Sequence, residues 1–368
     1  MSTLNLKVWV EIDKAAAKHN YQQVRSLIDK KTKLWSVVKS NAYGHGLVAF
    51  ASLADELGAD GFCVDSVIEG VKLREQGIKK PILVLGPTFP NLLADAVAQD
   101  ITITVSNFDP LDELNKSKLK PKFHLKLDTG MHRQGFYVDE IPMIIKKLSD
   151  KTLLTGVYTH FASAKDINYP TFTDLQFAAF LAGIELLEKA GFKNLIRHCA
   201  ASGATLIDKK YHLDAVRTGI ALYGLWPSKE LDVQLSDEIE LTPVLSWHAL
   251  VSEVKDVEAG DYIGYDLTER MAKDGKIAVI PIGYWHGFPR ALSGAGEVLI
   301  NGEKAKVLGR VSMDMIVVDV SAIKCQRGDI ATLIGKNLSV YEMAQKTGAS
   351  HYELITRINP LVERIVLS

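Results

Sequence analysis

A lysine at the end of a short apolar run is the most informative chemical feature of the sequence. The run Leu34–Val38 is bounded by polar and turn-forming residues, which is typical of a buried strand in a parallel sheet. Lys39 follows it directly. A lysine that emerges from a buried strand becomes an amine nucleophile when desolvation removes its proton. Gly44 and Gly46 come next and allow the backbone to approach a ligand closely.

Ionisable residues also lie at the predicted ends of later strands. Lys126 leads into the loop Asp128–Arg133, and three further strands end at His160, His198 and Arg217. Barrel enzymes keep their active sites at the carboxyl ends of their strands. One charged side chain at a strand end is usually a solvated surface group. Several that converge on one rim predict a catalytic site.

Two glycine-containing loops on the same rim predict a phosphate site. Ala201-Ser202-Gly203 is expected to open a helix, and free N–H groups at a helix start attract anions. The next loop contains Gly219 and Ile220. Barrels often bind phosphate with the loops after strands seven and eight. In the alternative interpretation Ser202 is only a helix cap and Gly219 only a turn glycine.

Eight β-rich runs alternate with amphipathic helical patterns between residue 33 and about residue 220. This alternation predicts an α/β barrel of the (β/α)8 TIM type, assigned to residues 1–240. The expected strands are Leu34–Val38, Gly61–Val64, Ile82–Leu85, Ile101–Val105, Lys122–Leu127, Leu154–His160, Leu195–His198 and Asp214–Arg217. The expected helices include Leu47–Leu57, Ser66–Glu75, Ile141–Leu148, Phe172–Lys189 and one that begins near Asp13, after an early strand Val8–Ile12.

After Gly224 the pattern changes. Residues 226–243 are polar and flanked by proline, which predicts an irregular connection. The apolar runs that follow are separated by Gly and Asp and predict a mainly antiparallel β domain over residues 241–368. Its expected strands are Leu245–Val254, Lys276–Pro281, Glu297–Ile300, Ala305–Leu308, Met315–Val320 and Asp329–Ile334, with short helices at 338–346 and 352–358.

Composition excludes several classes of protein. The 368 residues carry a formal net charge of −1, which argues against a nucleic-acid partner. The three cysteines form neither a disulfide framework nor a zinc motif, and the ten histidines show no ligand spacing, so no metal is expected. The sequence contains no signal peptide and no apolar stretch long enough to span a membrane. We therefore expect a cytoplasmic protein with no membrane partner.

Six motifs resemble those of the alanine racemase family and occur in the family's order. They are Val37–Gly46, Lys126–Gly135 (KLDTGMHRQG), Thr159–Phe161, Val216–Gly224 (VRTGIALYG), Pro281–Gly287 (PIGYWHG) and Gly309–Asp314 (GRVSMD). The first resembles the site at which this family attaches pyridoxal phosphate. On this resemblance the chain is identified as a member of the bacterial-type alanine racemases. These are pyridoxal-phosphate-dependent isomerases with an N-terminal barrel and a C-terminal β domain, and they supply D-alanine for peptidoglycan.

The resemblance also implies roles for individual residues. Lys39 would bind pyridoxal 5′-phosphate covalently and act as one of two acid–base groups, and Tyr265 would act on the opposite face of the substrate Cα. Arg133 and Met313 would contact the substrate carboxylate region. The residues around the cofactor would be Tyr43, His160, Ser202, Arg217, Gly219 and Ile220.

A homodimer with shared active sites is a further implication, because Tyr265 and its neighbours complete the partner's site in this family. Tyr284 and Asp314 would line the entrance. Lys126 matches a lysine that is carbamylated in some members. Pro360 matches a position where some members place a tyrosine on the cofactor phosphate.

Parts of the sequence also fit other functions. Residues 44–49 fit the dinucleotide pattern G-x-G-x-x-A with Asp65 about 20 residues on, which favours a dinucleotide-dependent oxidoreductase, but residues 39–43 separate the strand from the first glycine. A barrel that only stores pyridoxal phosphate would not need the second domain. A decarboxylase of the same plan would place a carboxylate, not Arg217, at the ring nitrogen. Serine or broad-specificity racemisation stays open, since a methyl-sized difference is worth only about 1–3 kcal/mol.

Overall fold

The computed structural model describes residues 6–165 and 167–368, which divide into two compact units. The barrel unit comprises residues 16–42 and 50–242. The β unit comprises the described residues up to 15, residues 43–49 and residues 243–368. The first strand of the chain therefore belongs to the same unit as the last 126 residues.

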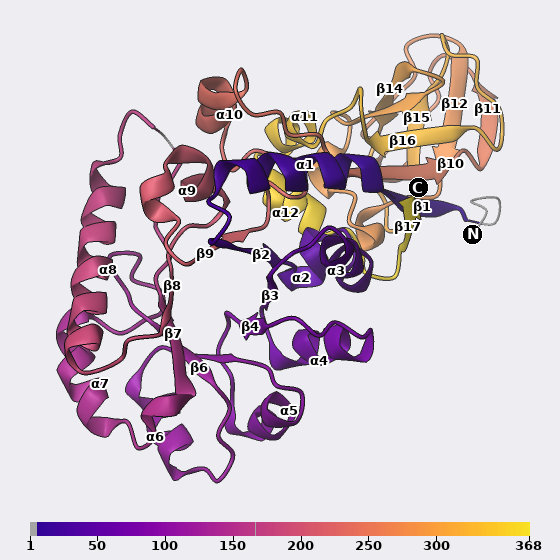
Figure 1. The fold of residues 1–368 in the computed structure, drawn as a ribbon. Coiled ribbons are helices and arrows are strands. Elements are labelled where there is room, and N and C mark those ends of the chain that lie inside the picture. The colour runs from indigo at the N-terminus through magenta and orange to yellow at the C-terminus, as the bar shows by residue number, and fades with distance from the viewer. Residues whose placement is uncertain (1–5, 166) are drawn as a thin grey trace. The chain divides into compact units, whose positions relative to one another are not determined.

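Eight parallel strands form the centre of the barrel unit (Figure 1). Two four-stranded sheets, ordered β4-β3-β2-β9 and β5-β6-β7-β8, are joined at both ends. The Val84 N–H donates to the Thr102 carbonyl between β4 and β5, and the Arg217 N–H donates to the Ala200 carbonyl between β8 and β9, both at 2.9 Å. The predicted (β/α)8 barrel is thus confirmed. The strands are β2 (Lys33–Val37), β3 (Gly61–Val64), β4 (Ile82–Val84), β5 (Ile103–Val105), β6 (Phe123–Lys126), β7 (Leu154–Tyr158), β8 (Ile196–His198) and β9 (Ala215–Thr218).

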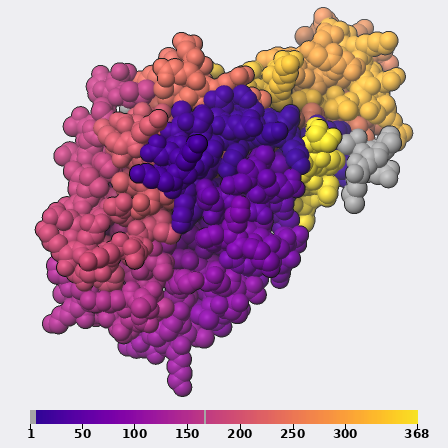
Figure 2. Space-filling model, in the orientation of Figure 1, coloured from indigo at the N-terminus to yellow at the C-terminus, as the bar shows by residue number. Residues whose placement is uncertain are grey.

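Helices follow the strands and cover the outside of the barrel (Figure 1). Figure 2 shows part of this layer from outside, where the indigo and purple side chains pack closely. No helix in the described part of the chain is long and apolar enough to cross a membrane. The α-helices are α1 (Lys14–Leu27), α3 (Leu47–Glu56), α4 (Val67–Glu75), α5 (Leu93–Ala98), α6 (Phe108–Lys116), α7 (Ile141–Lys147), α8 (Thr171–Lys189), α9 (Ser202–Ile207) and α10 (Lys229–Leu235). Short 3₁₀ turns lie at Pro90–Leu92, Val138–Glu140, Lys151–Leu153 and Lys209–Tyr211.

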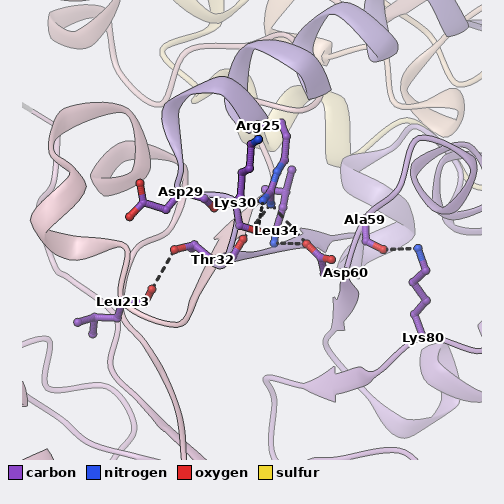
Figure 3. A network of polar contacts seen from close by, with 9 residues as sticks. All are labelled: Arg25, Asp29, Lys30, Thr32, Leu34, Ala59, Asp60, Lys80 and Leu213. Atoms are coloured by element: carbon purple, nitrogen blue, oxygen red, sulfur yellow. Dashed lines mark hydrogen bonds and ion pairs between the residues drawn. The ribbon is translucent and has the colours of Figure 1, made fainter.

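A polar network holds the amino-terminal ends of the barrel strands together (Figure 3). The guanidinium of Arg25 donates to the carbonyl oxygens of Asp29, Lys30 and Thr32 at 2.9–3.1 Å. It also lies 3.5 Å from the Asp60 carboxylate, which accepts the Leu34 N–H at 2.8 Å. One arginine therefore fixes the turn that leads into β2.

We predict that Arg25→Ala lowers the free energy of unfolding by about 1–3 kcal/mol, because three carbonyl groups lose a charged donor at once. Urea unfolding of the variant and the wild type measures this difference. Lys30→Ala is the matched control, because the network uses only the carbonyl oxygen of Lys30. Equal stability of all three proteins would show that the network is not a structural anchor.

The β unit contains a nine-stranded sheet, ordered β11-β12-β15-β14-β13-β16-β10-β1-β17. Every neighbouring pair is antiparallel except β1 and β17, so the prediction of a mainly antiparallel domain is confirmed. Its strands are β1 (Val8–Asp13), β10 (Leu245–Leu250), β11 (Glu253–Val257), β12 (Gly275–Ile280), β13 (Glu297–Ile300), β14 (Glu303–Leu308), β15 (Ile316–Asp319), β16 (Ile330–Ile334) and β17 (Glu363–Leu367). Its α-helices are α11 (Val340–Thr347) and α12 (His351–Thr356), and a 3₁₀ turn lies at Arg290–Leu292.

Two predicted elements are wrong in detail. Residues 245–254 form two strands rather than one, because the N–H groups of Val251 and Ser252 donate to two different neighbouring segments. Residues 226–243 are not irregular throughout, since they contain α10. The hydroxyl oxygen of the serine that precedes α10 accepts a backbone N–H of its first turn and starts the helix there.

Candidate active site

Lys39 lies at the carboxyl end of β2, one residue beyond Val38, and is half-buried. It begins the short helix α2 (Lys39–Tyr43), in which the backbone turns left-handed at once. Ser40, Asn41 and Ala42 have φ angles of 55°, 56° and 51°. A left-handed residue with a Cβ costs roughly 1–2 kcal/mol, so such a run persists only where other contacts hold it. Backbone strain directly after the lysine is typical of a functional site.

The carboxylate of Glu69 supports this strained turn. Its Oε1 accepts the Ser40 N–H at 2.8 Å, and its Oε2 accepts the Asp65 N–H at 2.7 Å. The hydroxyl of Tyr223 donates to the Val37 carbonyl at 2.7 Å and fixes the last residue of β2. Neither side chain is among the residues predicted from the sequence. The one available signal was the serine-x-x-glutamate spacing that ends at Glu69, which is typical of a helix start.

The hydroxyl of Ser202 joins the loops after β8 and β9. Its Oγ accepts the N–H groups of Gly219 at 3.0 Å and of Ala221 at 3.4 Å. The N-cap of α9 is Ala201 and no side chain caps the helix, so the alternative in which Ser202 is only a helix cap is wrong. Because the serine oxygen accepts both bonds, its own hydrogen stays available for a ligand. Ile220 is buried in the same loop.

The guanidinium of Arg217 is buried inside the barrel and is bonded to neutral acceptors. One terminal nitrogen lies 2.6 Å from Nδ1 of His198, and the other donates to the carbonyl oxygens of Thr159 at 2.8 Å and Cys199 at 3.2 Å. Burial lowers the pKa of Arg217. The ordinary pKa of arginine is so high that the group stays cationic at neutral pH. A buried cation without a bonded carboxylate is a site prepared for an electron-rich ligand atom.

His160 follows β7 and is half-buried. Burial, followed by the positive charges of Arg217, Lys126, Arg133 and Lys39, lowers the pKa of His160 to about 3. Since the influence of a charge falls with distance, these four cations lie in the neighbourhood of the His160 ring. With its pKa lowered this far, the ring is neutral at neutral pH.

The loop that carries Arg133 is folded around Asp128. Oδ1 of Asp128 accepts the N–H groups of Gly130, Met131 and His132 at 2.9–3.0 Å. Burial raises the pKa of Asp128, but these three bonds outweigh it, so the net shift is downward. Arg133 comes next and is exposed, which leaves its guanidinium available to a substrate.

Lys126 is buried, and its Nζ donates to Oε1 of Gln134 at 3.3 Å. Burial, with the charges of Arg133 and Arg217, lowers the pKa of Lys126 to about 8. A substantial fraction of this amine is therefore neutral near neutral pH, which is the form that carbamylation requires.

Three of the predicted residues in the β unit lie on two adjacent loops. Tyr284 begins a 3₁₀ turn, Tyr284–His286, and its N–H donates to the Ser312 carbonyl at 3.1 Å. The N–H of Trp285 donates to the Met313 carbonyl at 3.0 Å. Met313 and Asp314 precede β15 and are exposed. Tyr284 and Met313 therefore share one surface.

Tyr265 lies on a neighbouring loop and is 68% exposed. It begins the 3₁₀ turn Tyr265–Leu267, after Gly264 with a φ angle of 74°. Asp266 pairs with Arg310 at 2.6 Å, which ties this loop to the segment that carries Met313. The β unit therefore leaves most of the Tyr265 side chain exposed.

Tyr43 belongs to the β unit and its ring lies 6.2 Å from that of Tyr352, measured between centroids. The glycine after it is required, because a Cβ at Gly44 would lie 1.9 Å from the Ile355 carbonyl oxygen. Burial, followed by the neighbouring Tyr43, raises the pKa of Tyr352. The family resemblance implied Pro360 for the late phosphate position and did not indicate Tyr352. Its proximity to Tyr43 makes Tyr352 the better candidate.

A surface hollow of about 500 Å³ lies elsewhere, at the amino-terminal end of the barrel strands. Its lining includes Lys33, Arg197 and Asp214 and none of the predicted site residues. Within residues 6–165 and 167–368, no group of three His, Cys, Asp or Glu side chains is placed to hold a metal ion.

The side chains at the carboxyl end of the barrel suit pyridoxal 5′-phosphate. Lys39 supplies an amine for the aldehyde, and Ser202 supplies a donor for the phosphate. Thr218, beside these loops, has a buried hydroxyl oxygen without a hydrogen-bond partner in the described structure. Arg217 supplies a buried donor for a pyridine nitrogen. The donor set therefore matches the three polar ends of this cofactor.

The fold and this donor set define a cofactor-dependent barrel enzyme whose nucleophile is a lysine. Two family models match the chain, the alanine racemase N-terminal domain over residues 12–227 and the alanine racemase C-terminal domain over residues 244–366. The chain belongs to the alanine racemase family. It is therefore an isomerase of a family that depends on pyridoxal 5′-phosphate.

Named relatives and solved structures agree with this assignment. An alanine racemase of Methanococcus maripaludis is 38% identical over 98% of both chains, and one of Desulforamulus reducens is 36% identical over 98% of this chain and 99% of its own. The alanine racemase of Clostridium difficile superposes with a TM-score of 0.93 at 32% identity over 99% of this chain and 96% of its own. That of Bacillus anthracis with bound L-Ala-P gives 0.92 at 37% identity over 98% and 95%. The oxidoreductase alternative is wrong, since residues 33–64 form barrel strands rather than a doubly wound sheet.

We predict that the protein loses stability as the pH falls below about 6.5. Burial lowers the pKa of His124 and His160 to about 3, and that of His198 well below its usual range. In the unfolded chain these rings titrate near 6.5, so that state binds more protons at lower pH and is favoured there. Thermal unfolding between about pH 7.5 and pH 4.5 measures the slope. His124→Asn should flatten it, whereas the same change at the exposed His132 should not; equal slopes would contradict the prediction.

Proposed function

We propose that the chain interconverts L- and D-alanine, with Lys39 and Tyr265 as its two acid–base groups. Racemisation requires one group to remove the Cα proton and a second to return a proton on the opposite face. The bound cofactor supplies an electron-accepting ring that weakens the Cα–H bond. The observation that carries the proposal is that Lys39, Lys126, Arg133 and Arg217 all lie near enough to act on the neutral ring of His160.

Each residue near the cofactor has a defined task in this proposal. Ser202 and the loop of Gly219 and Ile220 bind the phosphate, together with Tyr43. Arg217 donates to the ring nitrogen and, because it stays protonated, keeps that nitrogen unprotonated. Arg217 would leave a bound ring a weaker electron acceptor than a carboxylate partner would, and this would favour fast return of the proton. His160 orients the hydroxyl of Tyr265.

The substrate is held by its carboxylate. Arg133 has the forked donors that suit this group, and Asp128 fixes the loop that presents it. Met313 packs against the same end of the substrate, and Tyr284 and Asp314 line the entrance. Alanine is the proposed substrate because the named relatives are alanine racemases. Serine or a broader set of amino acids is the alternative.

A homodimer with two shared sites completes the proposal. The loops around Tyr265 expose an unusual number of large apolar side chains, each between 45% and 68% accessible. They are Tyr262, Tyr265, Leu267, Tyr284, Trp285, Met313 and Met315. Apolar side chains gathered in this way mark interaction surfaces. In a dimer with a two-fold axis, the patch of each chain would pack against its partner chain. In this arrangement residues 1–240 bind the cofactor, and residues 241–368 supply the second base and the dimer contacts.

We also propose a cytoplasmic enzyme that provides D-alanine for peptidoglycan. The deciding experiment combines the visible absorption spectrum of the purified protein with racemisation assays on L-alanine and L-serine. The proposal expects a yellow protein that racemises alanine faster than serine. A protein that stays colourless with added pyridoxal phosphate, or that acts only on serine, would overturn it. Sedimentation at several concentrations tests the dimer.

A further inference from the structure

Two buried histidines extend inward from Arg217 and have no task in the proposed reaction. Nδ1 of His198 lies 2.6 Å from the Arg217 guanidinium, and Nε2 of His198 lies 2.8 Å from Nδ1 of His124. Both rings are no more than 2% exposed. The three side chains come from β6, β8 and β9 and form one continuous chain of hydrogen bonds across the interior of the barrel.

The direction of these bonds follows from chemistry. Arg217 has only donors, so Nδ1 of His198 must accept and its Nε2 must carry the proton. That proton is donated to Nδ1 of His124, which must therefore be unprotonated too. Burial and the charge of Arg217 lower the pKa of both rings, in agreement with two neutral imidazoles of defined tautomer.

The surrounding core is shaped to hold these rings. Tyr158 stacks on His198 with ring centroids 4.9 Å apart and planes within 5°, and Trp35 stacks on His124 at 5.7 Å. A Cβ at residue 156 would lie 2.5 Å from the His124 ring, so glycine is required there. The interiors of such barrels are usually filled by branched aliphatic residues. Burial of two polar rings here costs free energy that aliphatic side chains would not cost, so packing alone does not explain these histidines.

We propose that His198, backed by His124, is a positioning residue that fixes the plane of Arg217 and keeps it a full donor toward the cofactor. A carboxylate at this place would neutralise the guanidinium, and a protonated imidazole could not accept its N–H. A neutral imidazole accepts the N–H and leaves the positive charge of the guanidinium in place. His198, Thr159 and Cys199 accept from the two terminal nitrogens, so the Nε–H and one terminal N–H of Arg217 remain for a ligand. This inference rests on the proposed place of Arg217 at the ring nitrogen.

Matched variants separate positioning from packing. His198→Leu removes the acceptor, whereas His198→Asn retains one near the place of Nδ1. Thr104→Val is the control, because it removes a buried hydrogen bond to Tyr158, the ring that stacks on His198, but leaves the hydrogen bonds of both histidines in place. The measurements are the dissociation constant of pyridoxal phosphate and the pH dependence of the visible spectrum of the bound cofactor. In the cofactor-free protein, ¹⁵N spectra of labelled histidine report the tautomer of each ring.

The proposal expects His198→Leu to weaken cofactor binding at least about tenfold, which corresponds to about 1.4 kcal/mol, and to shift the spectral titration. His198→Asn should restore most of the cofactor affinity and most of the wild-type spectral titration. Thr104→Val should change neither of these two quantities, although all three variants lose stability. Equal defects in the leucine and asparagine variants, or an unchanged spectrum in both, would overturn the proposal. If His198→Leu does not fold, the asparagine variant and the histidine tautomers still test the proposal. A protonated Nδ1 on His198 in the wild-type protein would refute the proposal. The tautomers are read without cofactor, so this result stays distinguishable from a failure of the proposed function.

Discussion

Lys39→Ala should abolish racemisation, with kcat reduced by at least about 10⁴, because one residue carries both the cofactor bond and a proton-transfer role. The lysine lies at the end of β2, and Glu69 holds the backbone next to it. The measurement is the rate of D-alanine formation. Treatment with borohydride should leave the cofactor attached to the wild-type protein and removable from the variant.

The control for this experiment is Lys33→Ala. Lys33 begins the same strand at the opposite end of the barrel and is exposed, so its loss should leave the rate within about twofold of the wild type. Lys39→Arg separates charge from nucleophilicity: it keeps the cation but should be as inactive as the alanine variant, since guanidinium is a poor nucleophile. Activity above about one per cent of wild type in either variant at position 39 would show that Lys39 is not the attachment point.

The alternation of apolar runs and helical patterns was enough to predict the barrel, because its strands are short and most of them are buried on both faces. It was not enough for the β unit. In the run at 245–254 every second residue from Leu245 to Val251 is apolar, past the end of β10, so this pattern does not mark the change of partner strand. β17 was missed because Glu363 and Arg364 interrupt its apolar pattern, although it pairs in parallel with β1. Pairing over more than 350 residues leaves no local signal.

Residues of the candidate site were predictable where they stand at or just beyond the carboxyl end of a strand, as Lys39, His160 and Arg217 do. The residues that hold them were not. Glu69 acts from a helix on a turn 29 positions earlier in the chain, and His124 reaches His198 across the barrel interior. Both look like ordinary helix or strand residues until the fold brings their partners to them. The sequence therefore reveals the chemical groups more readily than the contacts that orient them.

Tyr265→Phe should lower kcat for alanine by about 10²–10⁴, because removal of one hydroxyl leaves one face of the substrate Cα without an acid–base group. Exchange of the α-hydrogen with deuterium from solvent tests this directly. The variant should retain exchange in one enantiomer, on the side served by Lys39, and lose it in the other. Tyr262→Phe is the matched control, since that side chain is exposed on the same loop but stacks with Arg270. Equal loss of exchange in both enantiomers would contradict a two-base mechanism.

A mixture of two inactive variants tests whether Tyr265 acts in the active site of the partner chain. Suppose that each site combines Lys39 of one chain with Tyr265 of the other. A dimer of one Lys39→Ala chain and one Tyr265→Phe chain then contains one site with both substitutions and one intact site. Random exchange of subunits makes half of the dimers mixed, so activity should return to about a quarter of the wild-type value. If both residues act within one chain, every site in the mixture lacks a base and no activity returns. The high exposure of Tyr265 in a single chain favours the first outcome.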